Sequence, residues 1–312
     1  MHEATLVFGP DQGLIGTLTL PAARADAAAA PCGMVLFNAG VVHRIGPHRI
    51  NVKLARELAR HGIPTIRFDL HGIGDSLGAD GKLSYQQQVV RDLQAAMDTL
   101  QDAASVQHFA LLGFCSGALP SYWAAQQDAR VRHIILYDAF SLQTGKSRRR
   151  YLAVRLRNHG FSPAALALYL QRAMGALRAL PIQLQSRLSR GRAERTADGG
   201  DQLTRVQFAE RFAALAQIGV QVTVLHSGAD FSNVNHAEQI AEAFGIQGAG
   251  VAGLHTGFLA SIDHIATSIS AQRAFIDSIR AAVLGTCGGA PDSARPARAG
   301  SATAARSVVE TH

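Results

Sequence analysis

Short apolar stretches alternate along the chain with longer segments whose apolar residues recur at helical spacing. We predict a β-strand wherever four to seven residues are continuously apolar or alternate strictly. These strands cover Ala4–Phe8, Leu14–Leu20, Met34–Phe37, Pro64–Phe68, Phe109–Leu112, Ile134–Tyr137, Val220–Leu225 and, from a weaker pattern, Val251–Leu254. The first two, separated by G-P-D-Q-G, are typical of an antiparallel hairpin.

Helices are predicted between these strands. Residues 48–61 place Ile50, Leu54 and Leu58 four residues apart, with Gly62 as a C-terminal cap. Four further helices are expected: one capped by Ser84 with the stripe Val89, Leu93, Met97 and Leu100, one ending near Ala125, one over 236–244, and one over 265–284. Strands and helices that alternate with short connections favour an α/β fold with a mostly parallel sheet covered on both faces.

The alternation stops over residues 141–219, which we interpret as an inserted helical unit. The core is therefore predicted to consist of two parts, 1–140 and 220–284. The Ala-rich stretch 22–31 is expected to be a loop. Residues 285–312 are rich in Gly, Ala, Pro, Ser and Arg and are expected to form a disordered tail.

The chain has a net charge of +7, and its excess of positive charge is concentrated in the insert. Residues 141–219 contain thirteen arginines and one lysine against four acidic residues, a balance of +10, so the rest of the chain carries −3. A charge confined to one insert differs from a basic face spread over a nucleic-acid-binding domain, so no nucleic-acid partner is expected. No apolar run reaches the roughly 18 residues needed to span a bilayer, and the N-terminus lacks the pattern of a signal peptide.

The three cysteines cannot form a disulfide framework, because one is always left over. A reducing cytoplasm is therefore expected, where a catalytic thiol stays usable. The candidate for that thiol is Cys115, in the motif G-F-C-S-G directly after an apolar strand. In an elbow of the form G-x-nucleophile-x-G, glycines flank the nucleophile at a sharp turn between strand and helix. The glycines here are Gly113 and Gly117, so the middle residue is Cys115, and Ser116 would need a slipped register.

In enzymes built around such an elbow, an acid and then a histidine follow later in the chain. Asp230, in H-S-G-A-D-F after the strand Val220–Leu225, is the expected acid, and His264, before the last helix, is the expected base. Asp138, after the preceding strand, is the main alternative acid, whereas Asp263 is too close to His264 along the chain. A buried cysteine in a Gly-rich turn and a helix-capping Asp-His pair are the structural alternatives.

An oxyanion hole needs two backbone N–H groups. The expected donors are Ser116, directly after the nucleophile, and Val41 in the loop N-A-G-V-V-H-R, with Gly40 as the alternative. His43 and Arg44 follow in the same loop, where they either contact the substrate or only fix the loop.

On these residues the chain resembles the α/β-hydrolase superfamily over residues 1–140 and 220–284. The motifs N-A-G-V-V-H-R-I-G-P-H-R, G-F-C-S-G, S-G-A-D-F and D-H-I resemble bacterial hydrolases of the serine-aminopeptidase-like type, and among these the exosortase-associated hydrolases. A cysteine in the elbow is also similar to dienelactone hydrolase. The resemblance implies an α/β-hydrolase fold in which the Arg-rich insert is the lid. Apolar residues of this insert suggest helices that close over an apolar pocket: Phe161, Leu166, Leu168, Tyr169, Leu170, Met174, Leu177 and Leu180.

The expected activity is hydrolysis of an ester or thioester through an acyl-enzyme on Cys115. An acyltransferase with the same triad and a non-catalytic binding protein are the alternatives. The lid arginines would attract an acyl carrier protein, a coenzyme A thioester or an anionic membrane surface, unless they are only a solvated cationic face. No metal and no cofactor is expected, since G-I-G-D-S lacks the spacing of a dinucleotide site.

Overall fold

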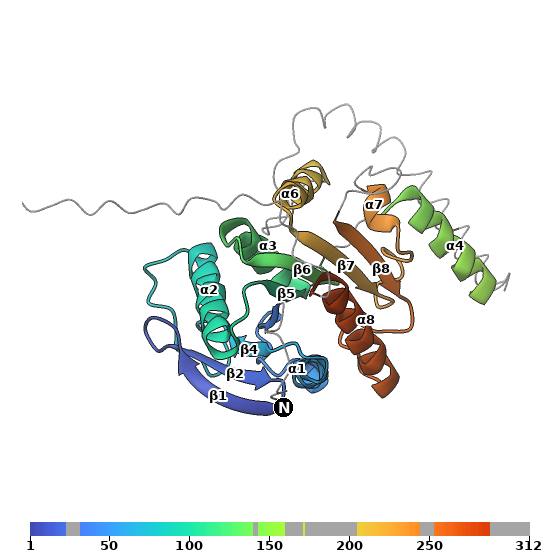
Figure 1. Cartoon of the computed structure of the whole chain (residues 1–312). Helices are drawn as coiled ribbons and strands as arrows, with labels where there is room; N and C mark the ends of the chain where they lie inside the picture. The colour runs from blue at the N-terminus through green and yellow to red at the C-terminus, as the bar shows by residue number, and fades with distance from the viewer. Residues whose placement is uncertain (23–31, 140–142, 160–170, 172–204, 244–252, 288–312) are drawn as a thin grey trace, which may run out of the picture.

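The computed structural model describes residues 1–22, 32–139, 143–159, 171, 205–243 and 253–287. Its centre is an eight-stranded sheet with the strand order β1-β2-β4-β3-β5-β6-β7-β8 (Figure 1). The strands are β1 (His2–Phe8), β2 (Leu14–Leu20), β3 (Gly33–Leu36), β4 (Thr65–Asp69), β5 (Phe109–Phe114), β6 (Val131–Tyr137), β7 (Gln221–Ser227) and β8 (Leu254–Leu259). The pairs β1–β2 and β2–β4 are antiparallel and the other pairs are parallel. The predicted α/β fold with a mostly parallel sheet is confirmed.

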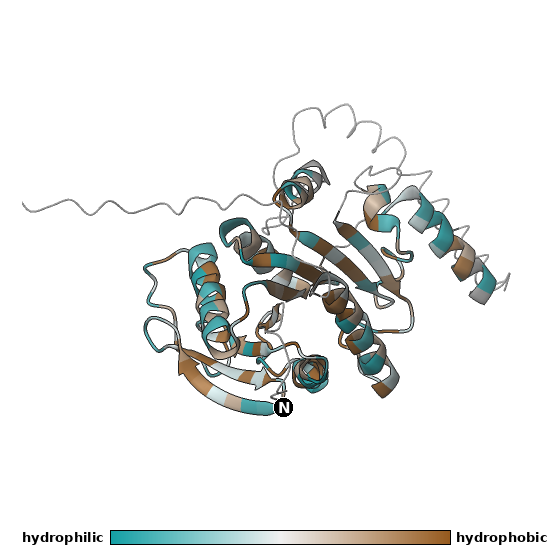
Figure 2. Ribbon diagram, in the orientation of Figure 1, coloured by the Kyte–Doolittle hydropathy of each residue, from teal (hydrophilic) through white to brown (hydrophobic). Residues whose placement is uncertain are grey.

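Helices cover both faces of this sheet (Figure 1). These are α1 (Ile50–Arg60), α2 (Tyr85–Ala104), α3 (Ala118–Gln127), α6 (Arg205–Gln217) and α8 (Ile269–Cys287). The described chain also has α4 (Gly145–His159) and α7 (Gln239–Ala243), and α4 lies at the periphery of the molecule (Figure 1). One apolar core joins α2, α3 and α6 to one face of the sheet, and a second joins α1 and α8 to the other face. The strands in the middle of the sheet are largely hydrophobic, as a sheet buried on both faces requires (Figure 2).

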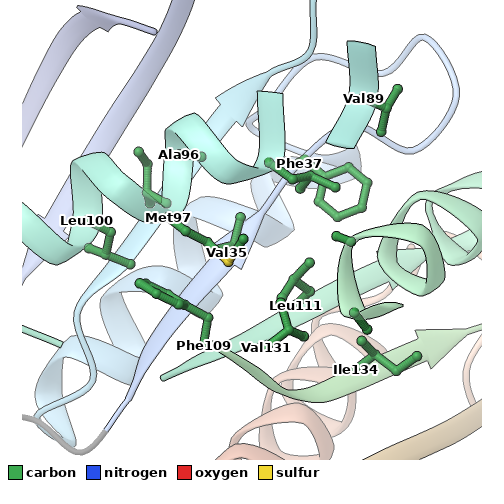
Figure 3. Packing of buried hydrophobic residues seen from close by; sticks show 14 of the residues in the cluster. Val35, Phe37, Val89, Ala96, Met97, Leu100, Phe109, Leu111, Val131 and Ile134 are labelled. Atoms are coloured by element: carbon green, nitrogen blue, oxygen red, sulfur yellow. The ribbon is translucent and has the colours of Figure 1, made fainter. Parts of the chain in front are cut away.

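The two cores are built from alternate residues of the same strands. On β5, Phe109 and Leu111 belong to the core under α2, whereas Ala110 and Leu112 belong to the core under α1 and α8. Figure 3 shows the first core, in which Met97 and Leu100 of α2 pack onto the sheet beside Phe109. This two-residue period is the expected consequence of strand geometry, so the apolar runs read from the sequence are buried on both sides.

Several element ends differ from the sequence-based prediction for local reasons. Strand β8 covers Leu254–Leu259, because its ladder with β7 starts at Gly253, whose carbonyl accepts from the Val222 amide at 2.7 Å. The last helix starts at Ile269 instead of 265, since Ser268 caps it by accepting from the Ala271 amide at 3.1 Å. The same helix continues to Cys287, three residues into the predicted tail.

Other predictions fall partly outside the described residues. Of the insert 141–219, the structure describes α4 and α6. The apolar residues from Phe161 to Leu180 that suggested a pocket-closing lid lie outside the described residues, as do loop residues 23–31 and tail residues 288–312. Within the described part of the chain, no helix is both long and apolar enough to cross a membrane.

The cysteines differ from expectation in one respect. Cys115 is the free cysteine of the described chain, but Cys32, at the buried start of β3, is disulfide-bonded. The odd cysteine expected from the count is Cys115, but the disulfide at Cys32 means that the cysteine count no longer argues for a reducing compartment.

Candidate active site

Cys115 lies at a sharp turn between β5 and α3. Its backbone φ is +50°, a left-handed conformation that costs a non-glycine residue about 1–3 kcal/mol. The flanking glycines permit the turn: a Cβ on Gly113 would lie 2.8 Å from the Gly117 carbonyl oxygen and 2.8 Å from Ser121 Oγ. The predicted elbow geometry around Cys115 is therefore present, with the thiol free and partly exposed.

His264 comes from the loop between β8 and α8. Its imidazole packs edge-on against Phe114, the residue before the cysteine, with the ring centroids 5.4 Å apart. Nδ1 of His264 is 2.9 Å from Oδ2 of Asp138, and the histidine side chain is 42% exposed while the aspartate is 13% exposed. The structure thus brings the predicted base to the elbow and ties it to a mostly buried carboxylate.

The partner of His264 differs from the sequence-based prediction. Asp230 was the expected acid, but its carboxylate accepts hydrogen bonds within its own turn. The donors are the Ser232 hydroxyl at 2.9 Å and the side-chain amide of Asn233 at 2.9 and 3.0 Å. Asp138, the alternative, directly follows β6 with φ +47° and is anchored through its amide to the Leu225 carbonyl. The pairing of Asp230 with His264 is therefore corrected to a pairing of Asp138 with His264.

The loop with the expected oxyanion donors Val41 and Gly40 lies against the elbow. The Gly40 amide donates to Ser116 Oγ at 2.6 Å, which places this N–H against the elbow. Gly40 has φ +56°, a conformation that suits glycine. Val41 instead exposes 88% of its surface to solvent. The Gly40 N–H is engaged by the Ser116 hydroxyl, and the exposure of Val41 describes the residue and not the direction of its N–H, so the choice between Val41 and Gly40 as second donor stays a prediction.

Arg44 is part of the loop's support. It is only 8% exposed, its amide donates to Asp69 Oδ1 at 2.6 Å, and its Nη1 lies 2.5 Å from Asp69 Oδ2 and 2.6 Å from Asp75 Oδ2. Burial alone would lower the pKa of Arg44, yet the hydrogen bonds to Asp75 and Asp69 raise it above its usual value. His43 shares this network through Asp75, at 3.1 Å. Of the two interpretations of these residues, the structure supports the one in which they fix the loop.

The same network bears on metal binding. His43, Asp69 and Asp75 are a group that could hold a metal ion, with one ligand atom from each within 4.8 Å of the others. The Arg44 guanidinium already lies against both carboxylates and supplies the positive charge there. A cation would have to displace a buried arginine, so the donor set does not fit a metal site.

Two residues that sequence analysis missed complete the surroundings. Ser227, the last residue of β7, hydrogen-bonds Asp138, and the Tyr137 hydroxyl donates to the Asp263 carbonyl at 3.2 Å. Burial raises the pKa of Tyr137 well above its usual value, so the phenol stays protonated and can donate. Tyr137 ends a predicted strand and Ser227 lies two residues beyond the predicted end of another, at Leu225, and nothing in their local sequence marks either of them.

A parallel sheet with a nucleophile elbow after β5, and a histidine before the last helix paired with an aspartate at a strand end, defines an α/β hydrolase. The chain belongs to the family described as serine aminopeptidase, S33, whose model matches residues 30–239. It is an enzyme of the α/β-hydrolase fold, although cysteine occupies the position where that family's name leads one to expect serine. No curated protein matches the chain.

Solved structures agree with the fold. The chain is similar to the α/β hydrolase GrgF from Penicillium sp. sh18, at 16% identity and a TM-score of 0.52, covering 93% of this chain and 100% of that one. It is also similar to Est1E from Butyrivibrio proteoclasticus, solved with ferulic acid bound, at 14% identity and a TM-score of 0.51, covering 88% and 96%. The esterase domain from a Rhodothermus marinus protein matches at 16% identity and a TM-score of 0.50, covering 92% and 100%. At these identities the likeness concerns the fold alone.

Proposed function

We propose that the protein hydrolyses carboxylic esters or thioesters through a Cys115–His264–Asp138 triad and an acyl-enzyme intermediate. The observation that carries this proposal is the 2.9 Å hydrogen bond between His264 and Asp138, formed beside a free cysteine in a strained elbow. An ionised aspartate can only accept hydrogen bonds, so Nδ1 of His264 carries the proton and Nε2 keeps the lone pair of a base.

The chemistry follows from these positions. Nε2 of His264 takes the thiol proton, and the Cys115 sulfur attacks the carbonyl carbon, whose oxygen becomes negative and accepts from the amide of Ser116 and from that of Val41 or, once it is released from the Ser116 hydroxyl, Gly40. When the tetrahedral species collapses, the bond to the leaving group breaks and that group takes the proton from His264. A water molecule then gives its proton to Nε2, attacks the thioester and releases the acid together with the free thiol. Asp138 stabilises the imidazolium in both steps.

The cysteine narrows the substrate class. A thiolate leaves more easily than an amine, so an intermediate formed on an amide tends to revert unless strong acid assistance is given. Esters and thioesters have better leaving groups, which favours them over peptides. The apolar side chains of Val41 and Ile265 are exposed and follow Gly40 and His264 in the chain, so they are candidates for contact with an apolar acyl group.

The basic helix α4 supports a second element of the proposal, an anionic acyl donor. It contains Lys146 and five arginines, Arg148, Arg149, Arg150, Arg155 and Arg157, with no acidic residue. Lys146 pairs with Glu242, and Arg148, Arg149 and Arg150 are exposed. A carrier-protein or coenzyme A thioester would be attracted by this charge over a distance set by ionic strength.

The test separates the two candidate acids. Wild-type protein should hydrolyse a short p-nitrophenyl ester, and iodoacetamide at about pH 6.5 should label Cys115 selectively, because only a thiolate reacts well. The Cys115→Ala and His264→Ala variants should each lose on the order of a thousandfold or more in turnover. Asp138→Asn should lose at least about a hundredfold, since it removes the group that orients the base.

Asp230→Asn is the matched control for Asp138→Asn. It changes the same atoms in the neighbouring turn and should keep wild-type turnover. A large loss in Asp230→Asn with none in Asp138→Asn would refute the assignment of the acid. An unreactive Cys115 with no ester turnover would favour a binding protein, and ester products formed on an added alcohol would identify an acyltransferase.

A further inference from the structure

The carboxylate of Asp138 is hydrogen-bonded by His264 and also by Ser227. Ser227 ends β7, which lies next to β6, and it is only 2% exposed. Its amide donates to Asp138 Oδ1 at 2.6 Å, and its hydroxyl is 2.6 Å from Asp138 Oδ2. Both oxygens of the carboxylate therefore contact the same serine.

The direction of the hydroxyl bond is fixed by its surroundings. The Ala229 amide donates to Ser227 Oγ at 3.2 Å, so this oxygen accepts one hydrogen bond and has a single proton to give. That proton goes to Asp138, because an ionised carboxylate has none. Oδ2 of Asp138 then accepts from both Ser227 and His264, whose Nδ1 is 2.9 Å away.

We propose that Ser227 is a positioning residue of the catalytic machinery, acting through Asp138, so that the site is a Cys-His-Asp-Ser tetrad. This inference rests on the proposed function. The serine has two effects: its amide and hydroxyl fix the plane of the carboxylate, and its hydroxyl draws negative charge from the oxygen that faces His264. A carboxylate oxygen that already accepts one hydrogen bond stabilises a neighbouring imidazolium less.

Removal of the hydroxyl therefore has a predictable sign. In Ser227→Ala, Oδ2 has His264 as its remaining side-chain donor, and the imidazolium is favoured more strongly. The acid limb of kcat/KM against pH should move up by about half a pH unit, and kcat should fall about tenfold because the carboxylate is held less firmly. Among the other titratable groups around the pair, Tyr137 on β6 also hydrogen-bonds the Ser227 side chain and keeps the Asp263 carbonyl as its partner when that side chain is removed. Tyr137→Phe, measured alongside, isolates the part of any change that comes from the phenol. Cys115 at the elbow and Asp263 beside the histidine also face the pair.

The experiment measures ester hydrolysis and the rate of Cys115 alkylation as functions of pH for wild type, Ser227→Ala and Ser227→Thr. Threonine keeps a hydroxyl and should restore both kcat and the position of the acid limb. Ser278→Ala is the control, since it removes a partly buried hydroxyl that donates to the Ala274 carbonyl on α8, away from the site. Thermal unfolding of each variant verifies that it is folded.

The outcomes are distinct. A shifted acid limb with lower kcat in Ser227→Ala, restored by threonine, supports the proposal. A lower kcat with an unmoved acid limb, or a Ser227→Ala profile identical to wild type, overturns it while the triad stands. Absence of both ester turnover and Cys115 alkylation in wild type refutes the proposed function itself. If Ser227→Ala does not fold, the ester profile of Ser227→Cys decides, because a thiol is a weaker donor to Asp138 than the hydroxyl. An acid limb that moves up together with a lower kcat supports the proposal, and an unmoved limb overturns it.

Discussion

Acidification should destabilise the fold through His133, a residue of β6 far along the strand from Asp138. His133 is 1% exposed, its Nε2 lies 2.9 Å from Thr223 Oγ1 and its Nδ1 lies 3.0 Å from Thr286 Oγ1. Burial, with a smaller contribution from the charge of His255, lowers the pKa of His133 from 6.5 to about 3. The folded protein therefore holds this imidazole neutral under conditions where the unfolded chain protonates it.

The sign and size of the effect follow from this pKa. Because the unfolded state binds the proton first, the stability contributed by neutral His133 is complete above about pH 7.5 and is lost as the pH falls from 6.5 toward 3. Integration over the interval from pH 7 to pH 5 gives a loss of about 2 kcal/mol in the free energy of unfolding.

Urea unfolding at pH 7, 6 and 5 measures this loss. In His133→Gln the group that titrates is absent, so the difference in unfolding free energy between pH 7 and pH 5 should be about 2 kcal/mol smaller than in wild type. His2→Gln, at an exposed position of β1, is the control and should keep the wild-type dependence. Equal pH dependence in wild type and His133→Gln would refute the argument, whatever their absolute stabilities.

Three further predictions concern the site. Tyr137→Phe removes the hydrogen bond to the Asp263 carbonyl that anchors the turn before His264, so kcat for a p-nitrophenyl ester should fall about threefold to tenfold with KM little changed, as steady-state kinetics would show. Gly113→Ala inserts a Cβ 2.8 Å from the Gly117 carbonyl oxygen and should cost about 1–3 kcal/mol, measured as a lower Tm, together with most of the activity. If the arginines of α4 attract an anionic thioester, kcat/KM for a coenzyme A thioester should fall steeply between about 0.05 and 0.5 M salt. The value for a neutral ester should stay nearly constant. Equal dependence of kcat/KM on salt for the two substrates would contradict this.

The sequence predicts the parts of the molecule that depend on local pattern. The strands, the elbow at Cys115 and the order of the proposed nucleophile and base follow from apolar runs and from two glycines four residues apart. The acid does not, because Asp138 and Asp230 both follow neighbouring parallel strands. What separates them is tertiary: Ser232 and Asn233 use the carboxylate of Asp230 within its own turn, while Ser227 and His264 converge on Asp138.

The oxyanion loop illustrates a second limit. Val41 and Gly40 are adjacent, so spacing alone cannot decide which N–H faces the elbow. The choice depends on a positive φ at Gly40 and on contacts of the loop with Asp69, which lies at the end of β4. The sequence-based prediction ended β8 too early, at Leu254. The strand L-H-T-G-F-L contains a histidine and a glycine, so it shows no continuous apolar run.

Cys115, Asp138 and Ser227 sit at the same end of three adjacent parallel strands, β5, β6 and β7. Their separations are set by backbone ladders about 4.8 Å apart, a spacing that the connecting segments do not influence. Insertions, deletions or exchanges in those connections can therefore alter which molecules reach the reacting centre without disturbing its geometry. For protein engineering, changes are best placed in connecting segments, while the strand termini are kept fixed.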